Sequence, residues 1–368
     1  MCLLLFIFQK FCLYIVKRIY LIFINHIMEK PFNFIFLYSK KRSTFNYDDL
    51  RAKLKAKLPK VHFYLISVED IEKEIKELPT KDIKMLTTMP FFASHIPFIM
   101  KSLPSIRWIH SATAGIEPFF KVDEIKNLKP GYNFSSSKGA YSDSLAEWSI
   151  LALLYFNYNV PTFIESNEKR EWTKIRNQLV QQKTILIYGY GGNGVALAKR
   201  IKPAFNMKII AVIREKRDNI EGKEFCDEIY TFEEVTKEII YKSDYIYATL
   251  PETPKTINIF DANFFNSMNK NAVFINIGRG TAVVEKDIAD ALNNNTIRGA
   301  LLDVTQKEPL EKNSPLYDIG RNKLLITNHS VGFTPIIEHL CYDRIIENIE
   351  CYLKEGKPKH IVNIKEQY

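Results

Sequence analysis

The feature that most constrains the fold of this chain is a short apolar run followed at once by a cluster of glycines. The run covers residues 184–188, Thr-Ile-Leu-Ile-Tyr, and Gly189, Gly191 and Gly194 follow it in the spacing G-x-G-x-x-G. Residues 195–201 then have the apolar spacing of a helix. A strand, a glycine turn and a helix in this order are typical of the first unit of a dinucleotide-binding domain.

Each glycine of this motif has its own expected role. Gly189 permits a tight turn, Gly191 lets the backbone approach a pyrophosphate, and Gly194 permits close packing of the helix on the strand. The N–H groups and the positive dipole end of the helix would face the phosphates. A glycine turn that binds nothing is the alternative, but the flanking strand and helix favour a binding site. The expected cofactor-binding residues of this segment are Gly189, Gly191, Gly192, Asn193 and Gly194.

Elsewhere the chain alternates short apolar strands with helical segments, which predicts parallel sheets with helices on both faces. A chain of 368 residues is too long for one core, so we expect two α/β domains. One is a doubly wound Rossmann cofactor domain over 144–330, and the other is a flavodoxin-like substrate domain over 31–143, to which 331–368 returns. The active site is expected in the cleft between them. Strands are expected at 32–38, 61–66, 83–88, 106–110, 184–188, 208–213, 228–231, 244–249, 272–277, 299–304 and 324–327.

Residues 145–158 form an unusual segment, because they are apolar almost all round. A helix with no polar face is expected to be buried on every side. Ser142, Asp143 and Ser144 precede it and are good N-cap residues. Since obligate interfaces resemble a core cut in half, this helix also predicts a homodimer. A final helix is expected over 335–354.

The composition limits the partners and the compartment. The formal net charge is +9, but lysines alternate with Glu and Asp along the chain, so we interpret the charge as a solvated surface and expect no nucleic acid partner. The number of cysteines is odd and no pair has CxxC spacing, which argues against a disulfide framework and a zinc site. This pattern fits a reducing compartment, and we expect a cytoplasmic protein. The cysteines are Cys2, Cys12, Cys226, Cys341 and Cys351.

Residues 1–30 are expected to be an extension outside the fold, because a second methionine, Met28, stands just before the first expected strand. Lys10, Lys17 and Arg18 interrupt the apolar runs of residues 1–27. An uninterrupted membrane span of about 20 residues is therefore not available, and no stable membrane contact is expected. A signal anchor or an unusual organellar targeting segment is the alternative.

The end of the second strand of the cofactor domain is expected to distinguish NADP from NAD. NAD enzymes usually place an Asp or Glu there, to bind the ribose hydroxyls. The corresponding position here is Ile213, and Arg214 follows it, with Lys216 and Arg217 close behind. This pattern favours NADP, whose 2′-phosphate would bind Arg214. The alternative is that these cations are solvated and that Glu215 takes the acidic role.

Three later segments each place a charged or titratable residue just beyond an expected strand. They are Arg279 in NIGRG, Glu308 in DVTQKEP and His329 in ITNHS. The carboxyl ends of the strands meet at one edge of a doubly wound sheet, so these side chains can converge there. An arginine fork suits a carboxylate, a histidine can exchange a proton with a carbonyl oxygen, and a glutamate can orient that histidine.

With these segments in order, the chain resembles the D-isomer-specific 2-hydroxyacid dehydrogenase family from about residue 32 to residue 362. The other matching segments are PSIRWIHSATAGIE at 104–117, SKGAYSDSLAEW at 137–148, the glycine motif, and ATLPETPKT at 248–256. The resemblance implies an NAD(P)-dependent oxidoreductase that interconverts a small 2-keto acid and a D-2-hydroxy acid, with glyoxylate or hydroxypyruvate as the expected substrate. A non-catalytic dinucleotide sensor on the same fold, like the transcriptional corepressors of this family, is the alternative.

The resemblance also implies roles for individual residues. Arg279 would bind the substrate carboxylate, Glu308 would partner the catalytic His329, and Asp303 would contact the cofactor. Further cofactor-binding residues implied in this way are Leu250, Pro251, Thr256, Ile277 and Gly278. Backbone N–H groups of the loop at 110–117 would face the carboxylate, unless this loop is only a tight turn after a strand; its residues are Ala112, Ala114 and Gly115.

Some positions depart from the pattern of the family. Asn328 replaces the usual proline before the histidine, and Thr305 and Gln306 replace an aromatic and an acidic residue. These departures bear on the subfamily and the substrate, since no catalytic group is removed. The other histidines have no metal-ligand spacing, so no metal is expected and they are interpreted as structural or exposed. They are His62, His95, His110, His339 and His360.

Overall fold

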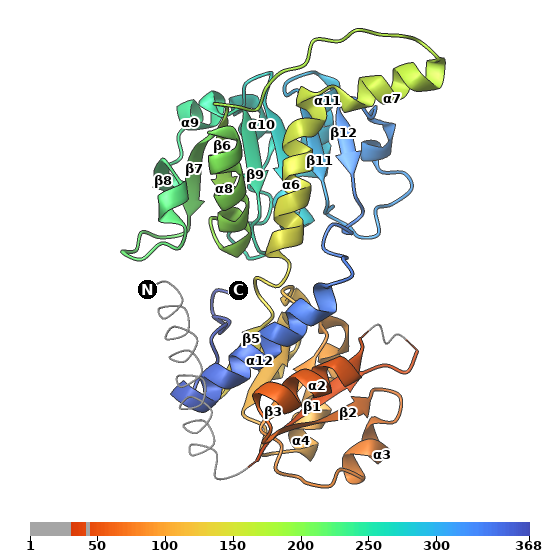
Figure 1. The fold of residues 1–368 in the computed structure, drawn as a ribbon, viewed down its shortest axis with the longest axis vertical. Coiled ribbons are helices and arrows are strands. Elements are labelled where there is room, and N and C mark those ends of the chain that lie inside the picture. The colour runs from red at the N-terminus through yellow and green to blue at the C-terminus, as the bar shows by residue number, and fades with distance from the viewer. Residues whose placement is uncertain (1–30, 42–44) are drawn as a thin grey trace, which may run out of the picture. The chain divides into compact units, whose positions relative to one another are not determined.

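A computed structural model describes residues 31–41 and 45–368 of the chain. It divides into two compact units (Figure 1): the described residues up to Lys138 with Glu338–Gln367, and Gly139–Ile337 with Tyr368. Each unit is built on one parallel sheet with helices on both faces, which confirms the expected fold class. The expected extension at 1–30, with Met28, lies outside the described residues. Within the described residues, no helix is long and apolar enough to cross a membrane.

The first unit has a five-stranded sheet in the order β2-β1-β3-β4-β5, which is the flavodoxin-like order. Its strands are β1 (Phe32–Tyr38), β2 (Val61–Ser67), β3 (Met85–Thr88), β4 (Trp108–Ser111) and β5 (Asn133–Ser136). Helices α2 (Tyr47–Lys57) and α12 (Ile337–Glu355) supply apolar side chains to one face, and α3 (Ile71–Lys76) and α4 (Ile96–Ser102) to the other. Shorter helical segments are η1 (Pro90–His95), η2 (Glu117–Lys121) and α5 (Asp123–Lys126).

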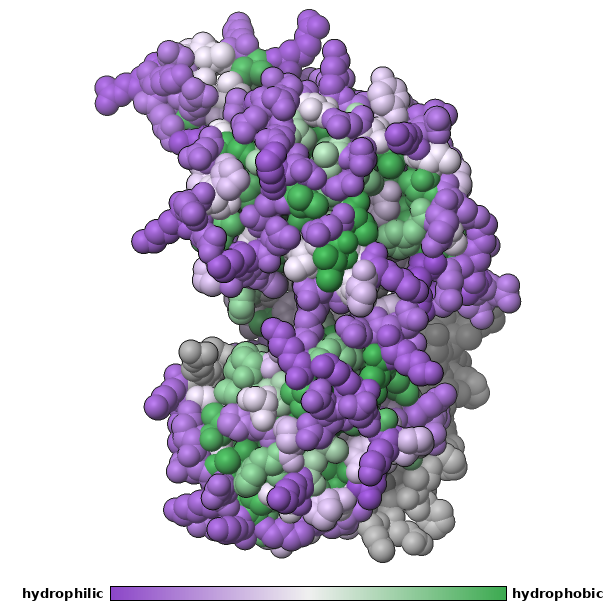
Figure 2. Space-filling view, turned by 180° about the vertical axis from the view of Figure 1, so that it is seen from behind, coloured by the Kyte–Doolittle hydropathy of each residue, from purple (hydrophilic) through white to green (hydrophobic). Residues whose placement is uncertain are grey.

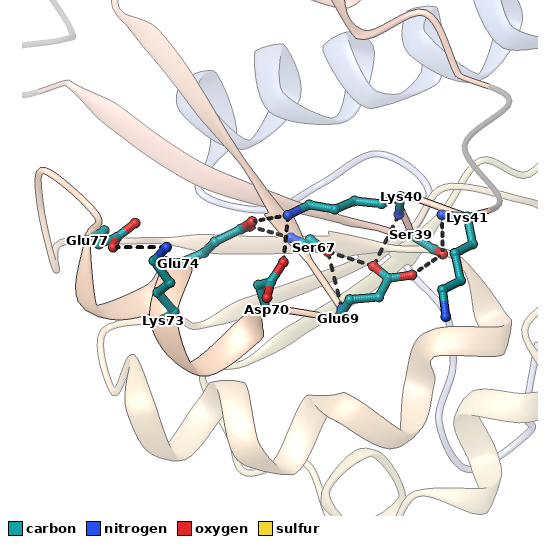
Figure 3. Close-up of polar contacts among 9 residues, drawn as sticks. All are labelled: Ser39, Lys40, Lys41, Ser67, Glu69, Asp70, Lys73, Glu74 and Glu77. Carbon is teal, nitrogen blue, oxygen red and sulfur yellow. Dashed lines mark hydrogen bonds and ion pairs between the residues drawn. The ribbon is translucent and has the colours of Figure 1, made fainter.

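The loops that follow β1 and β2 are fastened to each other by a polar network (Figure 3). The carboxylate of Glu69 accepts hydrogen bonds from the hydroxyls of Ser39 at 2.5 Å and Ser67 at 2.6 Å, and from the backbone N–H of Lys40 at 3.1 Å. These hydrogen bonds, the one from Ser39 foremost, lower the pKa of Glu69 to about 2. Lys40 also forms an ion pair with Asp70 at 2.6 Å. Because these groups satisfy one another, we interpret the network as structural.

The second unit has a seven-stranded parallel sheet in the order β12-β11-β10-β9-β6-β7-β8. The chain starts near the middle at β6 and winds outward in both directions, as a doubly wound dinucleotide-binding sheet does. Its strands are β6 (Thr184–Tyr188), β7 (Lys208–Ile213), β8 (Glu228–Thr231), β9 (Tyr245–Ala248), β10 (Val273–Asn276), β11 (Gly299–Leu302) and β12 (Leu324–Ile326).

Helices cover both faces of this second sheet. Helices α6 (Ser142–Asn157) and α8 (Gly192–Phe205) pack on one face, and α9 (Lys237–Lys242), α10 (Ala262–Ser267) and α11 (Glu285–Asn293) pack on the other. Helix α7 (Val160–Lys169) follows α6. The short 3-10 segments are η3 (Lys223–Phe225), η4 (Phe232–Glu234), η5 (Gly280–Ala282) and η6 (Pro315–Asp318).

Helix α6 differs from expectation in two respects. Ser142, Asp143 and Ser144 lie inside its first turn, and Tyr141 before them makes no side-chain cap bond. The expected burial on every side is wrong for the single chain, because Leu151 is 49% exposed. The packing of α6 on β-strands and on α8 covers only one side of the helix.

The surface seen in Figure 2 is mostly hydrophilic, with smaller apolar areas between the polar side chains. Many of the exposed charges form pairs along helices, such as Lys169 with Glu165 at 2.6 Å and Lys286 with Asp290 at 2.5 Å. Paired, exposed charges of this kind fit the interpretation of the net positive charge as a solvated surface.

Candidate active site

The glycine turn lies between β6 and the start of α8. Gly189 has a φ of +95°, and a Cβ there would lie 2.8 Å from the carbonyl oxygen of Thr249. A Cβ at Gly194 would lie 2.8 Å from the carbonyl oxygen of Gly189. At Gly191, by contrast, a Cβ would meet nothing within 4 Å in the described part of the chain. The fold itself thus requires Gly189 and Gly194, whereas Gly191 leaves open space at the N-terminus of α8.

The side chain of Asn193 in the same turn is engaged within the protein. Its Nδ2 donates to the hydroxyl of Thr249 at 3.0 Å, and its Oδ1 accepts from the hydroxyl of Ser142 at 2.7 Å. The side chain therefore ties the starts of α6 and α8 to the end of β9. Gly192 and Asn193 would therefore contact a cofactor through their backbone N–H groups, which lie in the first turn of α8.

At the end of β7, the structure places Arg214 and Glu215 beside each other. Ile213 is the last residue of the strand, as the sequence predicts, and its side chain is buried. The Nη2 of Arg214 donates to Glu215 Oε1 at 2.8 Å, and the guanidinium lies 4.9 Å from the centre of the Tyr368 ring. Lys216 forms an ion pair with Glu234. Arg214 and Glu215 therefore lie together at the end of β7, and the hydrogen bond to Glu215 orients the guanidinium of Arg214.

The loops after β9 and β10 are in backbone contact. A Cβ at Gly278 would lie 2.5 Å from the backbone nitrogen of Leu250, so no larger residue fits between them. Leu250 and Ile277 are buried, and the hydroxyl of Thr256 donates to the carbonyl of Pro251 at 2.6 Å. The expected cofactor-binding residues of these two loops thus lie at the carboxyl ends of adjacent strands.

The expected pair of Glu308 and His329 is formed at the same sheet edge. Glu308 follows β11 and His329 follows β12, and His329 Nδ1 lies 2.7 Å from Glu308 Oε2. A carboxylate can only accept, so Nδ1 donates this hydrogen bond and Nε2 is left for other partners. The backbone N–H of Thr305 donates to the other carboxylate oxygen of Glu308 at 3.1 Å, which fixes the orientation of this carboxylate.

The two side chains shift each other's pKa. The hydrogen bond to Glu308 raises the pKa of His329, although partial burial opposes it. Burial acts to raise the pKa of Glu308, but the hydrogen bonds from His329 and Thr305 bring it below its ordinary value. The nearby charge of Arg279 lowers both pKa values. The pair therefore favours a protonated histidine beside an ionised carboxylate.

Arg279 is held in place by the backbone that surrounds it. Its Nη1 donates to the carbonyl of Gly278 at 2.8 Å. The buried side chain of Asn276 closes this turn, since its Nδ2 donates to the carbonyl of Arg279 and its Oδ1 accepts from the N–H of Gly278, both at 3.0 Å. A Cβ at Gly280 would lie 1.9 Å from the carbonyl oxygen of Thr305. The loop of Arg279 is thus pressed against the loop that carries Glu308.

Asn276 is a residue that the sequence reasoning missed. The signal was present, because a polar residue at the end of an apolar strand must find partners when it is buried. Asp303 also has partners that sequence reasoning did not supply. It is buried, and its Oδ1 accepts from the hydroxyl of Thr327 at 2.7 Å and from the N–H of Ser330 at 3.0 Å. It therefore fastens the loop that carries His329.

The expected substrate loop lies in the first unit, after β4, and the other expected site residues lie in the second. There the hydroxyl of Thr113 donates to the carbonyl of Gly115 at 3.2 Å, next to Ala114. His110 before it is fully buried, and burial lowers its pKa to about 3, so it is a neutral structural residue. Among the described residues, no group of His, Cys, Asp or Glu side chains is arranged to hold a metal ion.

Comparison with known proteins decides the family. The model of the D-isomer specific 2-hydroxyacid dehydrogenase NAD-binding domain matches residues 150–331. An uncharacterized protein of Corynebacterium melassecola is 31% identical over 265 residues, which cover 71% of this chain and 84% of that protein. The chain belongs to the D-isomer specific 2-hydroxyacid dehydrogenase family. It is thus an NAD(P)-dependent oxidoreductase, as the resemblance implied.

Other members of this dehydrogenase family are similar in sequence or in fold. The human glyoxylate reductase/hydroxypyruvate reductase is 33% identical over 217 residues, which cover 58% of this chain and 64% of the human protein. The solved structure of the D-isomer specific 2-hydroxyacid dehydrogenase of Xanthobacter autotrophicus Py2, in complex with NADPH and MES, has a TM-score of 0.74. The two chains are 21% identical, and the match covers 91% of this chain and 99% of the Xanthobacter chain, so the two proteins share a fold.

Proposed function

We propose that this protein reduces a small 2-keto acid to the D-2-hydroxy acid with NADPH, and that glyoxylate or hydroxypyruvate is its substrate. The observation that carries this proposal is the 2.7 Å pair of His329 and Glu308, with Arg279 in the neighbouring loop of the same sheet edge. The name of the human relative supports the substrate class, and the Xanthobacter structure, which holds NADPH, supports the cofactor. Since the named relative is a reductase, a purely regulatory sensor is not favoured.

The cofactor would be held by the second unit, and the first unit would serve as the substrate domain. The open space at Gly191 and the N-terminus of α8 suit the pyrophosphate. Arg214 would bind the 2′-phosphate, which would replace Glu215 as the acceptor of its fork. When bound, the dinucleotide supplies the hydride for the reduction.

Three side chains would handle the substrate. Arg279 would bind the carboxylate of the keto acid through its planar fork. His329, protonated, would donate the proton on Nε2 to the carbonyl oxygen, and in the reverse direction the neutral ring would take it back. Glu308 accepts from Nδ1, so it keeps the ring in this orientation and stabilises its protonated form.

The test of this assignment is the oxidation of NADPH by the purified protein with a panel of 2-keto acids that includes glyoxylate, hydroxypyruvate, pyruvate and 2-ketogluconate. We expect the highest kcat/KM with glyoxylate or hydroxypyruvate, and a product of D configuration where it is chiral. NADPH binding without turnover on any member of the panel would instead favour the sensor.

We also propose that the protein is a cytoplasmic homodimer. The outer side of α6 and the adjoining helix α7 expose Leu151, Phe163 and Ile164, which are 49%, 37% and 40% exposed. A partner chain would remove this apolar surface from water. Light scattering at micromolar concentration should give twice the chain mass, and Leu151→Asp should give the single chain. A monomeric wild type would refute the proposal. The cytoplasmic location rests on the cysteine pattern of the sequence, since an odd number of cysteines with no CxxC spacing fits a reducing compartment.

A further inference from the structure

His329 sits in a tight turn with an uncommon backbone conformation. The turn runs from Thr327 to Ser330 and is closed by a hydrogen bond from the N–H of Ser330 to the carbonyl of Thr327 at 3.1 Å. Both central residues, Asn328 and His329, have a φ of +54°. Two consecutive left-handed residues inside such a turn are the pattern of type I′, in which asparagine and glycine are strongly favoured at the first central position.

The left-handed conformation at position 328 restricts which residues fit there. Every residue except glycine places its Cβ close to the following carbonyl oxygen in this conformation. The short polar side chain of asparagine can offset this steric cost by local hydrogen bonding, and alanine has no group that does so. Proline is excluded, because its ring fixes φ near −65°. Asn328 is therefore matched to the observed turn, and the proline that the family usually has at this position is not.

The turn is fastened at its ends and at its centre. The carboxylate of Asp303 accepts from the hydroxyl of Thr327 and from the N–H of Ser330, and the carbonyl of Asp303 accepts from the N–H of His329 at 2.5 Å. The N–H of Thr327 donates to the carbonyl of Leu302 at the end of β11. Because these hydrogen bonds anchor the backbone of the turn, the direction of the His329 side chain depends on the φ angles of Asn328 and His329.

We infer that Asn328 is a positioning residue: by allowing the left-handed turn, it aims the imidazole of His329 at the carboxylate of Glu308. The catalytic meaning of this inference rests on the proposed function, but the geometry does not. The charged groups that act on His329 come from three loops, those of Glu308, Arg279 and Asp303. Of these, the hydrogen bond to Glu308 raises the pKa of His329 most, so a misdirected ring loses that effect first.

The experiment compares three substitutions at one position, Asn328→Gly, Asn328→Ala and Asn328→Pro, in the full-length protein. Turnover is measured with NADPH and glyoxylate. The titration of His329 is measured by NMR on protein labelled with ¹⁵N in histidine, and its resonance is identified by its absence in His329→Asn. Thermal unfolding of each variant serves as the control for folding.

We expect Asn328→Gly to keep kcat within about two-fold of wild type and to leave the titration of His329 unchanged, because glycine adopts positive φ freely. Asn328→Ala should lower kcat about ten-fold, which corresponds to ~1.4 kcal/mol, because alanine cannot offset the cost of the left-handed backbone with a polar side chain. Its His329 should titrate at lower pH than in wild type. Asn328→Pro should lower kcat more than a hundred-fold.

Equal kcat and equal His329 titration in the glycine and alanine variants would overturn the inference, as would wild-type activity in Asn328→Pro. If Asn328→Pro does not fold, the glycine and alanine pair still decides. The proposed function can fail separately: a wild type that reduces no 2-keto acid refutes that function, while the NMR titration still tests the positioning role.

Discussion

Substitution of Gly191 by alanine should separate cofactor binding from folding. The backbone at Gly191 has φ −105° and ψ −156°, an extended conformation that alanine can adopt, and its Cβ would enter open space. Alanine at an N-cap is about 0.5–1 kcal/mol less favourable than glycine, and the stiffer unfolded chain offsets roughly 0.4–1 kcal/mol of this cost. We therefore expect the free energy of unfolding to stay within about 1 kcal/mol of wild type.

The effect on NADPH should be much larger, because the methyl group would occupy the space into which the pyrophosphate must come. Each charge-assisted hydrogen bond lost from the N–H groups of this turn costs about 1.5–3 kcal/mol. The dissociation constant for NADPH should therefore rise by roughly ten- to hundred-fold for one such bond.

Gly189→Ala is the matched control, because we expect this substitution to lower the stability of the fold, which Gly191→Ala should leave nearly unchanged. At φ +95°, alanine pays about 1–2 kcal/mol for the left-handed backbone. The contact of its Cβ with the carbonyl of Thr249, at 2.8 Å, adds about 1–3 kcal/mol of overpacking. The sum of about 2–5 kcal/mol should lower Tm by roughly 4–20 °C.

The assay for both variants is thermal unfolding without cofactor, followed by calorimetric titration with NADPH. Normal NADPH affinity in Gly191→Ala would refute the placement of the pyrophosphate at the start of α8. A Gly189→Ala variant as stable as wild type would refute the steric reasoning for the turn.

Three further predictions concern the side chains at the sheet edge. Glu308→Gln should lower the pKa of His329. The protonated ring is the acid for reduction and is lost as pH rises through that pKa, so kcat/KM should begin to fall at a lower pH than in wild type. An unchanged pH profile would contradict this prediction. Arg279→Ala should lower kcat/KM for glyoxylate by roughly 10²–10⁴ with little change in NADPH affinity. In Arg279→Lys, only part of the lost kcat/KM should return; a wild-type kcat/KM in that variant would exclude a bidentate contact with the carboxylate. Arg214→Ala should lower the preference for NADPH over NADH by about ten- to hundred-fold, and an unaltered ratio of the two kcat/KM values would remove Arg214 from the 2′-phosphate site.

The apolar periodicity of the chain carries most of the information about the fold. The expected strands at 32–38, 184–188 and 208–213 coincide with β1, β6 and β7. Strand β5 was not expected, because only Phe134 among its four residues is apolar and its serines are buried by pairing with β4. Pairing with a distant strand is a tertiary effect that a local pattern does not encode.

The candidate site shows the same division between local and tertiary information. Arg279, Glu308 and His329 could be found because each follows an apolar strand, and the pairing of Glu308 with His329 follows from the sheet order. The anchoring role of Asp303 could not be found, since it depends on hydrogen bonds to residues more than twenty positions away. Nor does the sequence reveal that Asn328 adopts a positive φ, because asparagine is also common at negative φ.

The measurement that tests the central claim most directly is the steady-state reduction of glyoxylate and hydroxypyruvate by NADPH in wild type and in His329→Asn, with NADPH affinity determined for both. The account predicts turnover in the wild type, a kcat lower by roughly 10²–10⁴ in the variant, and nearly equal dissociation constants for NADPH. A wild type that binds NADPH but reduces neither acid, or a variant that turns over at the wild-type rate, would contradict it.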